Sequence, residues 1–366
     1  MKAITVFNKN NEKLSLIKQK ILNEERIFYF DLLRILSSYA VVLIHTSSKY
    51  YYKSNVNTYN WKISFYWNGL PRFGVPIFCM ISGTLFLKRD IYFKNIFCKY
   101  VKRLIITFYL WSLLYSIFSY LSNRNIKHFI LKFLSGHYHL WYLLTSSGLY
   151  IITPFLREII KNENLLKAFI ILFAIFSFII PNFIQFIYYY SYELYIPINN
   201  INYCLDLNSP RGYIFYYVIG YYLNYRYKIN RSKAIIIYLF GIFGMYFTTV
   251  ISHKITVMMQ TKMNFFSQKN INVLIFTISI FIFFKQNFNI SNLNKNNLIR
   301  NVSNHTFGIY LIHPLIIEFV FLKVFSFSKD LNLICHIPLM ALIIYILSLL
   351  IAIIIKKLPL IGNFLF

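Results

Sequence analysis

Acidic residues and cysteines are scarce in this sequence. Eleven Asp and Glu stand against 38 Lys and Arg, which gives a formal net charge of +27, and charged residues make up only 13% of the chain. So small a charged share is not typical of a soluble domain, whose surface must be polar. The four cysteines, Cys79, Cys98, Cys204 and Cys335, stand alone in or beside apolar segments. Their isolation argues against a disulfide framework and against a cysteine metal site.

Apolar side chains are abundant instead. Hydrophobic residues form 58% of the chain and aromatic residues 20%, and the mean hydropathy is +0.53. Apolar runs of about 20 residues recur, which is the length of a helix that crosses a bilayer. We therefore expect an all-α, polytopic membrane helix bundle of about ten transmembrane helices, multi-pass in the cell (inner or plasma) membrane. The expected spans are 27–48, 65–87, 101–122, 139–157, 166–187, 212–225, 233–252, 271–284, 305–325 and 332–355.

Membrane topology explains the excess of positive charge. The Lys and Arg residues lie mostly in short loops between apolar runs, so no nucleic-acid partner is expected. Most of them fall in the amino-terminal tail and in alternate loops, which the positive-inside rule places in the cytoplasm. Both termini are therefore expected to be cytoplasmic. Residues 1–26 are polar and basic, lack the apolar core of a cleavable signal peptide, and are expected to form a cytoplasmic basic tail.

The first apolar run carries an acid, a guanidinium and an imidazole, on Asp31, Arg34 and His45. Arg34 and His45 are eleven positions apart, which places them within ~20° of each other around a helix and roughly 16 Å apart along its axis. Charge that faces lipid costs several kcal/mol, so this polar seam is expected to face the bundle interior or a water-filled cavity. The simpler alternative is a structural Asp31–Arg34 ion pair near the cytoplasmic end, with His45 reaching outward.

The same run resembles the first helix of the acyltransferase 3 family, integral membrane enzymes that acylate sugars. That family begins with an Asp-Leu-Leu-Arg type run and has a histidine eleven residues after the arginine, as Asp31, Arg34 and His45 do here. The resemblance covers residues 27–360, which are expected to form one transmembrane domain. Four further segments resemble the family in the same order: 72–83 with Val-Pro-x-Phe and Ser-Gly, 136–143 with His-Leu-Trp-Tyr-Leu, the aromatic 212–223, and 303–315 with Phe-Gly-Ile-Tyr-Leu-x-His-Pro.

The resemblance implies an O-acyltransferase that moves an acyl group, most often acetyl, from acyl-CoA to a hydroxyl of a cell-surface polysaccharide or lipid-linked glycan precursor. It implies acyl-CoA (acetyl-CoA) as co-substrate and no permanently bound cofactor. His45 is the implied catalytic base, and histidine is the common choice for taking a hydroxyl proton near neutral pH. Arg34 is implied in donor binding, and Lys102 and Arg103 could also receive the phosphates of the donor.

Seven further residues are expected to support this site or to line the acceptor pocket. Ser82 and Tyr310 are candidate donors to the tetrahedral oxyanion. Each residue also has a plain structural role open to it: an interface anchor for Arg72, an aromatic belt for His139 and Trp141, a close helix contact for Ser82, and a packed histidine at a helix break for His313. No metal is expected, because no carboxylate accompanies the pair His137 and His139. The seven residues are Asp31, Arg72, Ser82, His139, Trp141, Tyr310 and His313.

A second class of function fits the same residues. In a glycan-precursor transporter or flippase, the polar seam of the first span would be a proton or substrate path. No internal repeat is visible, which disfavours a transporter built from inverted repeats. A non-catalytic membrane partner in a glycan-export complex is a third reading, and it would tolerate loss of His45.

Overall fold

The protein folds into helices throughout the part that the computed structural model describes, which is residues 26–204, 212–260, 266–288, 297–324 and 332–358. No β-strand occurs within these ranges. The all-α fold expected from the apolar runs is therefore confirmed for the described residues. The apolar side chains suit the hydrocarbon core of the bilayer, and the backbone N–H and C=O groups form hydrogen bonds with each other within each helix.

Helix α2 (Phe28–Lys53) lies at the centre of the bundle. Asp31 lies in its first turn and Lys53 in its last, where their charges suit the helix dipole. Several of its serine and threonine side chains bond to the backbone of the helix itself, as Thr46 does to the carbonyl of Val42 at 2.9 Å. The helices that contact it most extensively are α3 (Tyr59–Gly69), α4 (Gly74–Lys88), α15 (Asn297–Val324) and α16 (Leu333–Lys357).

Helices α3 and α4 form one span, joined by the 3₁₀ turn η1 (Leu70–Phe73). Helix α4 crosses α12 (Gly212–Tyr225) with the two backbones in contact. A methyl group added to Gly83 would lie 1.8 Å from the carbonyl oxygen of Tyr217, so only glycine fits there. Small residues permit such close approach between membrane helices. The pair Ser82-Gly83 thus makes the close helix contact that the sequence left open.

A π-helical turn precedes the basic pair Lys102 and Arg103. Such turns are rare and often mark functional sites. After the following helix pair the chain passes through Gly136, whose positive φ of 77° favours glycine. The elements of this part are α5 (Phe93–Asn95), the π-turn η2 (Ile96–Val101), α6 (Lys102–Asn123), α7 (Ile126–Ser135) and α8 (Trp141–Lys161).

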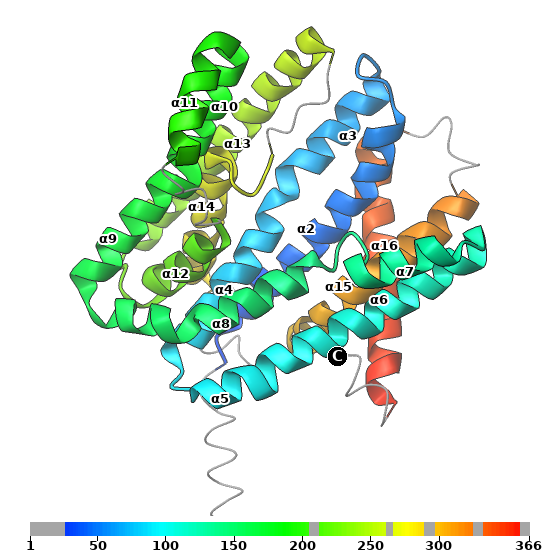
Figure 1. The fold of residues 1–366 in the computed structure, drawn as a ribbon, viewed down its shortest axis with the longest axis horizontal. Coiled ribbons are helices and arrows are strands. Elements are labelled where there is room, and N and C mark those ends of the chain that lie inside the picture. Colours follow the sequence, from blue (N-terminus) through cyan, green and yellow to red (C-terminus); the bar gives the residue numbers. More distant parts are fainter. Residues whose placement is uncertain (1–25, 205–211, 261–265, 289–296, 325–331, 359–366) are drawn as a thin grey trace, which may run out of the picture.

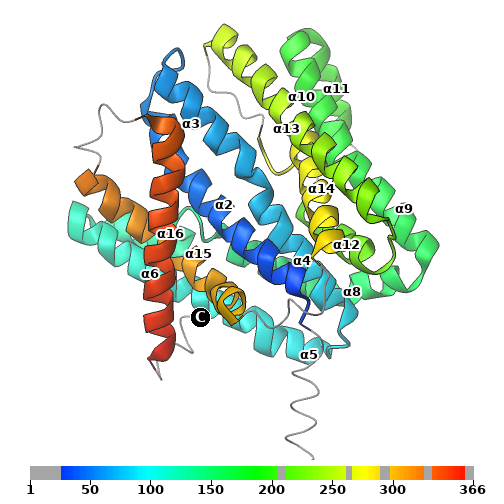
Figure 2. The ribbon, with the colours of Figure 1, turned by 180° about the vertical axis from the view of Figure 1, so that it is seen from behind.

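The helices within residues 163–287 form one side of the bundle. Helices α6, α7, α15 and α16 form the other side, and α2 and α4 lie between the two (Figure 1). Seen from behind, α16 passes over α2 and α15, and both contacts are direct (Figure 2). This arrangement leaves α2 with neighbours on both sides. The remaining elements are α9 (Glu163–Ala174), the π-turn η3 (Ile175–Ile179), α10 (Ile180–Tyr190), α11 (Tyr192–Cys204), α13 (Arg231–Met259) and α14 (Ile271–Asn287).

Several helices are long and apolar enough to cross a membrane, which makes this a multi-pass membrane protein. Phe240 and Phe243 of α13 are 68% and 63% exposed, as expected for side chains that face lipid. The three expected spans outside this set also fall on helices, α12, α14 and α15, so a total of ten stays a prediction. Within the described residues seven segments qualify: Phe28–Lys53, Tyr59–Lys88, Phe93–Leu121, Trp141–Lys161, Glu163–Tyr190, Arg231–Met259 and Leu333–Lys357.

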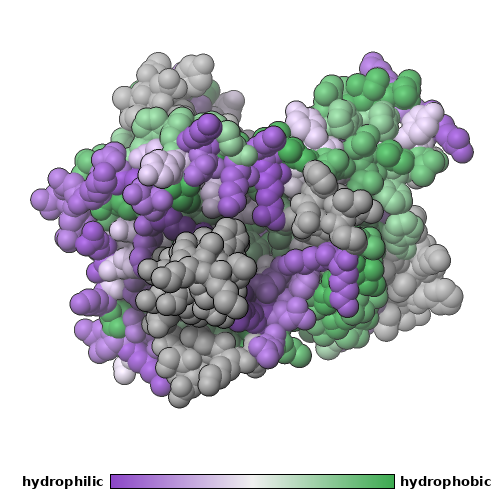
Figure 3. Space-filling view, turned by 90° about the horizontal axis from the view of Figure 1, so that it is seen from below, coloured by the Kyte–Doolittle hydropathy of each residue, from purple (hydrophilic) through white to green (hydrophobic). Residues whose placement is uncertain are grey.

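Hydrophilic residues gather on the face of the bundle that Figure 3 shows from below. Near α5, which lies at the bottom of Figure 1, the side chains of Lys88, Lys94, Lys99 and Lys102 are exposed. A concentration of basic residues at one end of the spans is the pattern expected of a cytoplasmic face. The placement of both termini on that side stays a prediction, and the expected tail at residues 1–26 lies outside the described residues except for Arg26.

Candidate active site

The buried carboxylate of Asp31 organises the start of α2. Its side chain is 3% exposed and accepts hydrogen bonds from the Arg26 guanidinium at 2.6 and 2.8 Å, from the Ser303 hydroxyl at 2.6 Å and from Arg34 Nη1 at 3.2 Å. A buried carboxylate needs such partners to offset its desolvation. Two guanidinium groups share one carboxylate, so a net positive charge remains at this end of the helix. The Asp31–Arg34 pair therefore exists, but Arg26 holds the carboxylate more closely.

Arg34 also lies near Tyr150 of α8. The Tyr150 hydroxyl interacts electrostatically with the guanidinium groups of Arg34 and Arg103, and the Ser82 hydroxyl lies close to it. These four residues come from four different helices, so the fold brings together two of the predicted donor contacts. Ser82, a predicted oxyanion donor, is thus grouped with Arg34 rather than with His45.

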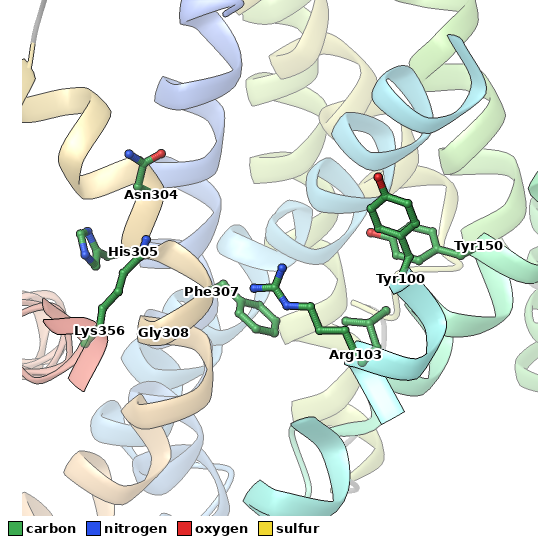
Figure 4. A pocket seen from close by; sticks show the side chains of 10 residues that line it. Tyr100, Arg103, Tyr150, Asn304, His305, Phe307, Gly308 and Lys356 are labelled. Carbon is green, nitrogen blue, oxygen red and sulfur yellow. The ribbon is translucent and has the colours of Figure 1, made fainter. Parts of the chain in front are cut away.

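A pocket of about 520 Å³ adjoins this group (Figure 4). Arg103 and Tyr150 line it, together with His305 of α15 and Lys356 of α16. In Figure 4, His305 and Lys356 lie across the pocket from Arg103. A volume of this size suits a small-molecule ligand, and two permanent cations suit one that carries several negative charges. Lys102 is exposed and does not line the pocket, so only Arg103 of the predicted basic pair does.

Four histidines gather around the other half of α2, and we call His45, His137, His139 and His313 the histidine cluster. The ring centroid of His45 lies 5.1 Å from that of Tyr138 and 5.2 Å from that of His313. The His313 ring in turn lies 5.5 Å from the ring of His139. His45 is therefore packed against other buried elements, so the polar seam faces the bundle interior and not lipid.

Hydrogen bonds set the direction of the buried imidazoles. His137 Nε2 lies 3.4 Å from Glu318 Oε1, and His137 Nδ1 lies 2.9 Å from Nδ1 of His139. His313 Nδ1 lies 3.1 Å from the carbonyl oxygen of Ile309. Because these oxygens only accept, the nitrogens that face them carry the hydrogens. Nε2 of His139 and Nε2 of His313 are buried and have no hydrogen-bond partner among the described residues. Both atoms therefore keep an unused hydrogen-bonding position inside the bundle.

Tyrosines connect the histidine cluster with the Arg34 end. The Tyr310 hydroxyl donates to the backbone carbonyl of His139 at 2.6 Å, and the Tyr310 ring lies 6.0 Å from that of Tyr142. Tyr142 interacts electrostatically with Tyr150, which adjoins Arg34. Since its hydrogen is already bound, Tyr310 positions the His139 segment and does not offer a vacant oxyanion donor.

Arg72 supports the backbone next to His45. It donates from Nε to the Asn68 carbonyl at 3.0 Å and from Nη2 to the Asn68 side-chain oxygen. The Asn68 amide donates to the carbonyl of Ile44 at 3.2 Å and to the Ser48 hydroxyl at 2.8 Å. Arg72 also interacts electrostatically with His45. The structure therefore places Arg72 within this end of the site.

Trp141 lies beside the site and not within the histidine cluster. Its side chain is 38% exposed, and its ring centroid is 5.5 Å from that of Tyr213. Tyr213 interacts electrostatically with Arg72, so Trp141 lies toward the Arg72 side. This position fits the rim of a pocket, and it also fits the aromatic belt that the sequence left open.

The structure adds residues that sequence analysis did not assign to the site. These are His137 of the histidine cluster, Glu318, which contacts His137, and the pocket residues His305 and Lys356. One signal was present for Glu318, because an acid inside an apolar run marks a functional candidate. Within the described ranges, no group of three or more His, Cys, Asp or Glu side chains is arranged to hold a metal.

Comparison with known proteins extends this picture. A family model described as an acyltransferase domain, of the acyltransferase 3 type, matches residues 27–357. No curated protein and no solved structure matches the chain. The matched range includes the Asp31 network, the pocket and the histidine cluster. Because the family model spans nearly the whole chain, the protein belongs to the acyltransferase 3 family and is a multi-pass membrane acyltransferase.

Proposed function

We propose that this protein transfers an acyl group from acyl-CoA to a hydroxyl of a cell-surface polysaccharide or of its lipid-linked precursor. Acetyl is the acyl group that we expect. One observation carries the proposal. Arg34 and His45 lie on one face of the central helix, and each joins a separate polar group inside the bundle. A cation-lined pocket adjoins the first group, and a cluster of imidazoles surrounds the second.

The donor binds at the Arg34 end. CoA carries several phosphate charges, and the pocket offers the cations of Arg103 and Lys356 from two helices. Guanidinium groups suit phosphate because they offer several donors in a plane. Arg34 lies near Tyr150, which lines this pocket, and there it orients the acyl end of the donor. The long pantetheine arm of CoA can span the roughly 16 Å along the helix axis between Arg34 and His45.

The acceptor hydroxyl binds at His45. A neutral imidazole takes the hydroxyl proton as the oxygen attacks the thioester carbonyl. The C–S bond then breaks, and the thiolate of CoA leaves. The sum of these steps converts acyl-CoA and an alcohol into an ester and free CoA. His45 is partly accessible, whereas the neighbouring His313 is fully buried, so His45 is the imidazole that a substrate can reach.

Label transfer tests the proposal. Membranes that contain the protein and its native glycans are incubated with [¹⁴C]acetyl-CoA, and the label is followed into the glycan fraction. We expect transfer by the wild-type protein and none by His45→Ala. A transporter or flippase would give no label in either case, and a non-catalytic partner would give equal label in both.

A further inference from the structure

Glu318 and two members of the histidine cluster form a series of polar contacts that ends at the surface. Glu318 contacts His137, and His137 contacts His139. The Glu318 side chain is 44% exposed, and that of His137 is 6% exposed. His137 is also stacked on Tyr115 of α6, with 4.1 Å between ring centroids, which holds its plane in place. The series therefore leads from the buried cluster to a carboxylate that the surroundings can reach.

The carboxylate of Glu318 determines the tautomers of His137 and His139. An ionised carboxylate accepts only, so the hydrogen of neutral His137 is on Nε2, facing Glu318. The Nδ1 atom of His137 is then an acceptor, and the hydrogen in its contact with His139 belongs to Nδ1 of His139. This leaves a lone pair on Nε2 of His139, the atom that has no partner among the described residues. Glu318 thus fixes which nitrogen of His139 can accept a proton.

We propose that His139, His137 and Glu318 form a proton relay that removes from the cluster the proton taken up by His45. This inference rests on the proposed function. His313 lies between the two ends of the transfer, since its ring contacts both His45 and His139. In this scheme His139 takes the proton, and His137 and Glu318 carry it onward to the surface.

Each proton in the relay has a donor and an acceptor. The hydroxyl proton passes to His45 and from there to Nε2 of His139, either directly or by way of Nε2 of His313, because Nδ1 of His313 stays bonded to the Ile309 carbonyl. The proton on Nδ1 of His139 moves to Nδ1 of His137, which becomes an imidazolium paired with Glu318. Its Nε2 proton then passes through the carboxylate to water. The thiolate of CoA takes up one proton from water at the donor end, so the overall reaction balances.

Charges near Glu318 support its role as an ionised acceptor. Lys49 of α2 and Lys132 of α7 both interact electrostatically with its carboxylate. Nearby cations favour the charged form of a carboxyl group. Lys132 is held in place by a hydrogen bond to Ser119 at 2.9 Å. The relay therefore ends between two lysines, in a setting that keeps the carboxylate able to pair with an imidazolium.

Substitution of Glu318 tests the relay. Glu318→Gln keeps the size and an acceptor oxygen but removes the charge, and Glu318→Leu removes both. With [¹⁴C]acetyl-CoA and native membranes, we expect the maximal rate per folded protein to fall about tenfold for Gln and further for Leu. The KM for acetyl-CoA should stay unchanged, because the pocket is at the other end of α2. Imidazole added to His137→Gly should restore part of the lost rate.

Glu158 provides the matched control, since it is 71% exposed and pairs with Lys161. Glu158→Gln and Glu158→Leu should keep the wild-type rate. A wild-type rate in Glu318→Gln and Glu318→Leu would overturn the relay, and so would a loss that appears as a higher KM for acetyl-CoA. Should Glu318→Leu fail to fold, Glu318→Gln and the imidazole response of His137→Gly still decide. Failure of the proposed function is distinct, because the wild-type protein would then transfer no label.

Discussion

His45 and His313 lie in ring contact inside the bundle, with 5.2 Å between their centroids, although one belongs to the first described helix and the other to α15. Contact between these helices extends down to Asp31 and Ser303, which are joined at 2.6 Å. The polar face of α2 is thus held against α15 at both ends. This pairing keeps the face of α2 that carries Arg34 and His45 turned toward α15 in the bundle interior.

Loss of the His45 imidazole should abolish transfer without unfolding the protein. His45→Ala and the larger His45→Gln should both lower the rate by at least about 10²-fold, because neither can take a proton near neutral pH. Rates are measured by label transfer and normalised to folded protein. Thermal unfolding in detergent serves as the control and should change little. Retention of the wild-type rate in His45→Gln would contradict the assignment of the base.

Loss of the Arg34 guanidinium should weaken donor binding. Arg34→Ala should raise the KM for acetyl-CoA about tenfold, which corresponds to ~1.4 kcal/mol for one charged contact. Arg34→Lys keeps the charge but loses the planar fork, so we expect an intermediate value. Initial rates over a range of acetyl-CoA concentrations give the result. If KM is unchanged and only thermal stability falls, then Arg34 is a structural partner of Asp31.

The central helix could be predicted from sequence because its signal is local. Charged and imidazole side chains at helical spacing within an apolar run must share an interior face, so Arg34 and His45 needed no tertiary information. The expected spans likewise fall on helices, although α13 extends from Arg231 to Met259 beyond the predicted 233–252. An apolar window marks the membrane core, whereas a helix continues until its hydrogen-bonding ends.

The partners in the site could not be predicted, because tertiary packing creates them. Nothing local indicates that Glu318 meets His137, or that Tyr310 donates to the carbonyl of His139. Helices α7 and α11 were also missed, since neither is an apolar run of spanning length. Likewise, Ser82 was expected to act on an oxyanion, but its position beside Tyr150 depends on how α4 meets α8.

The two neighbouring basic residues at the start of α6 should differ in their effect on donor affinity. Arg103→Ala should raise the KM for acetyl-CoA several-fold, since Arg103 lines the pocket, and Lys102→Ala should have a smaller effect because Lys102 does not. Screening by salt weakens exposed charge pairs, so the difference should shrink as ionic strength rises. Equal effects of the two substitutions would place the phosphates outside the pocket.

Contact between α4 and α12 should make Gly83 intolerant of any side chain. A methyl group there would lie 1.8 Å from the Tyr217 carbonyl oxygen, which is backbone and cannot turn away, so the helices must separate. We expect Gly83→Ala to lower stability by about 1–3 kcal/mol, the usual cost of overpacking.

Gly148 of α8 is the matched control, because a methyl group there would meet no atom within 4 Å. Gly148→Ala should leave stability unchanged or raise it by up to about 1 kcal/mol through helix propensity. Thermal unfolding in detergent compares the two variants. Because Ser82 precedes Gly83 and lies close to Tyr150 beside Arg34, Gly83→Ala should also raise the KM for acetyl-CoA. Equal melting temperatures for the two variants would mean that α4 and α12 do not cross in backbone contact.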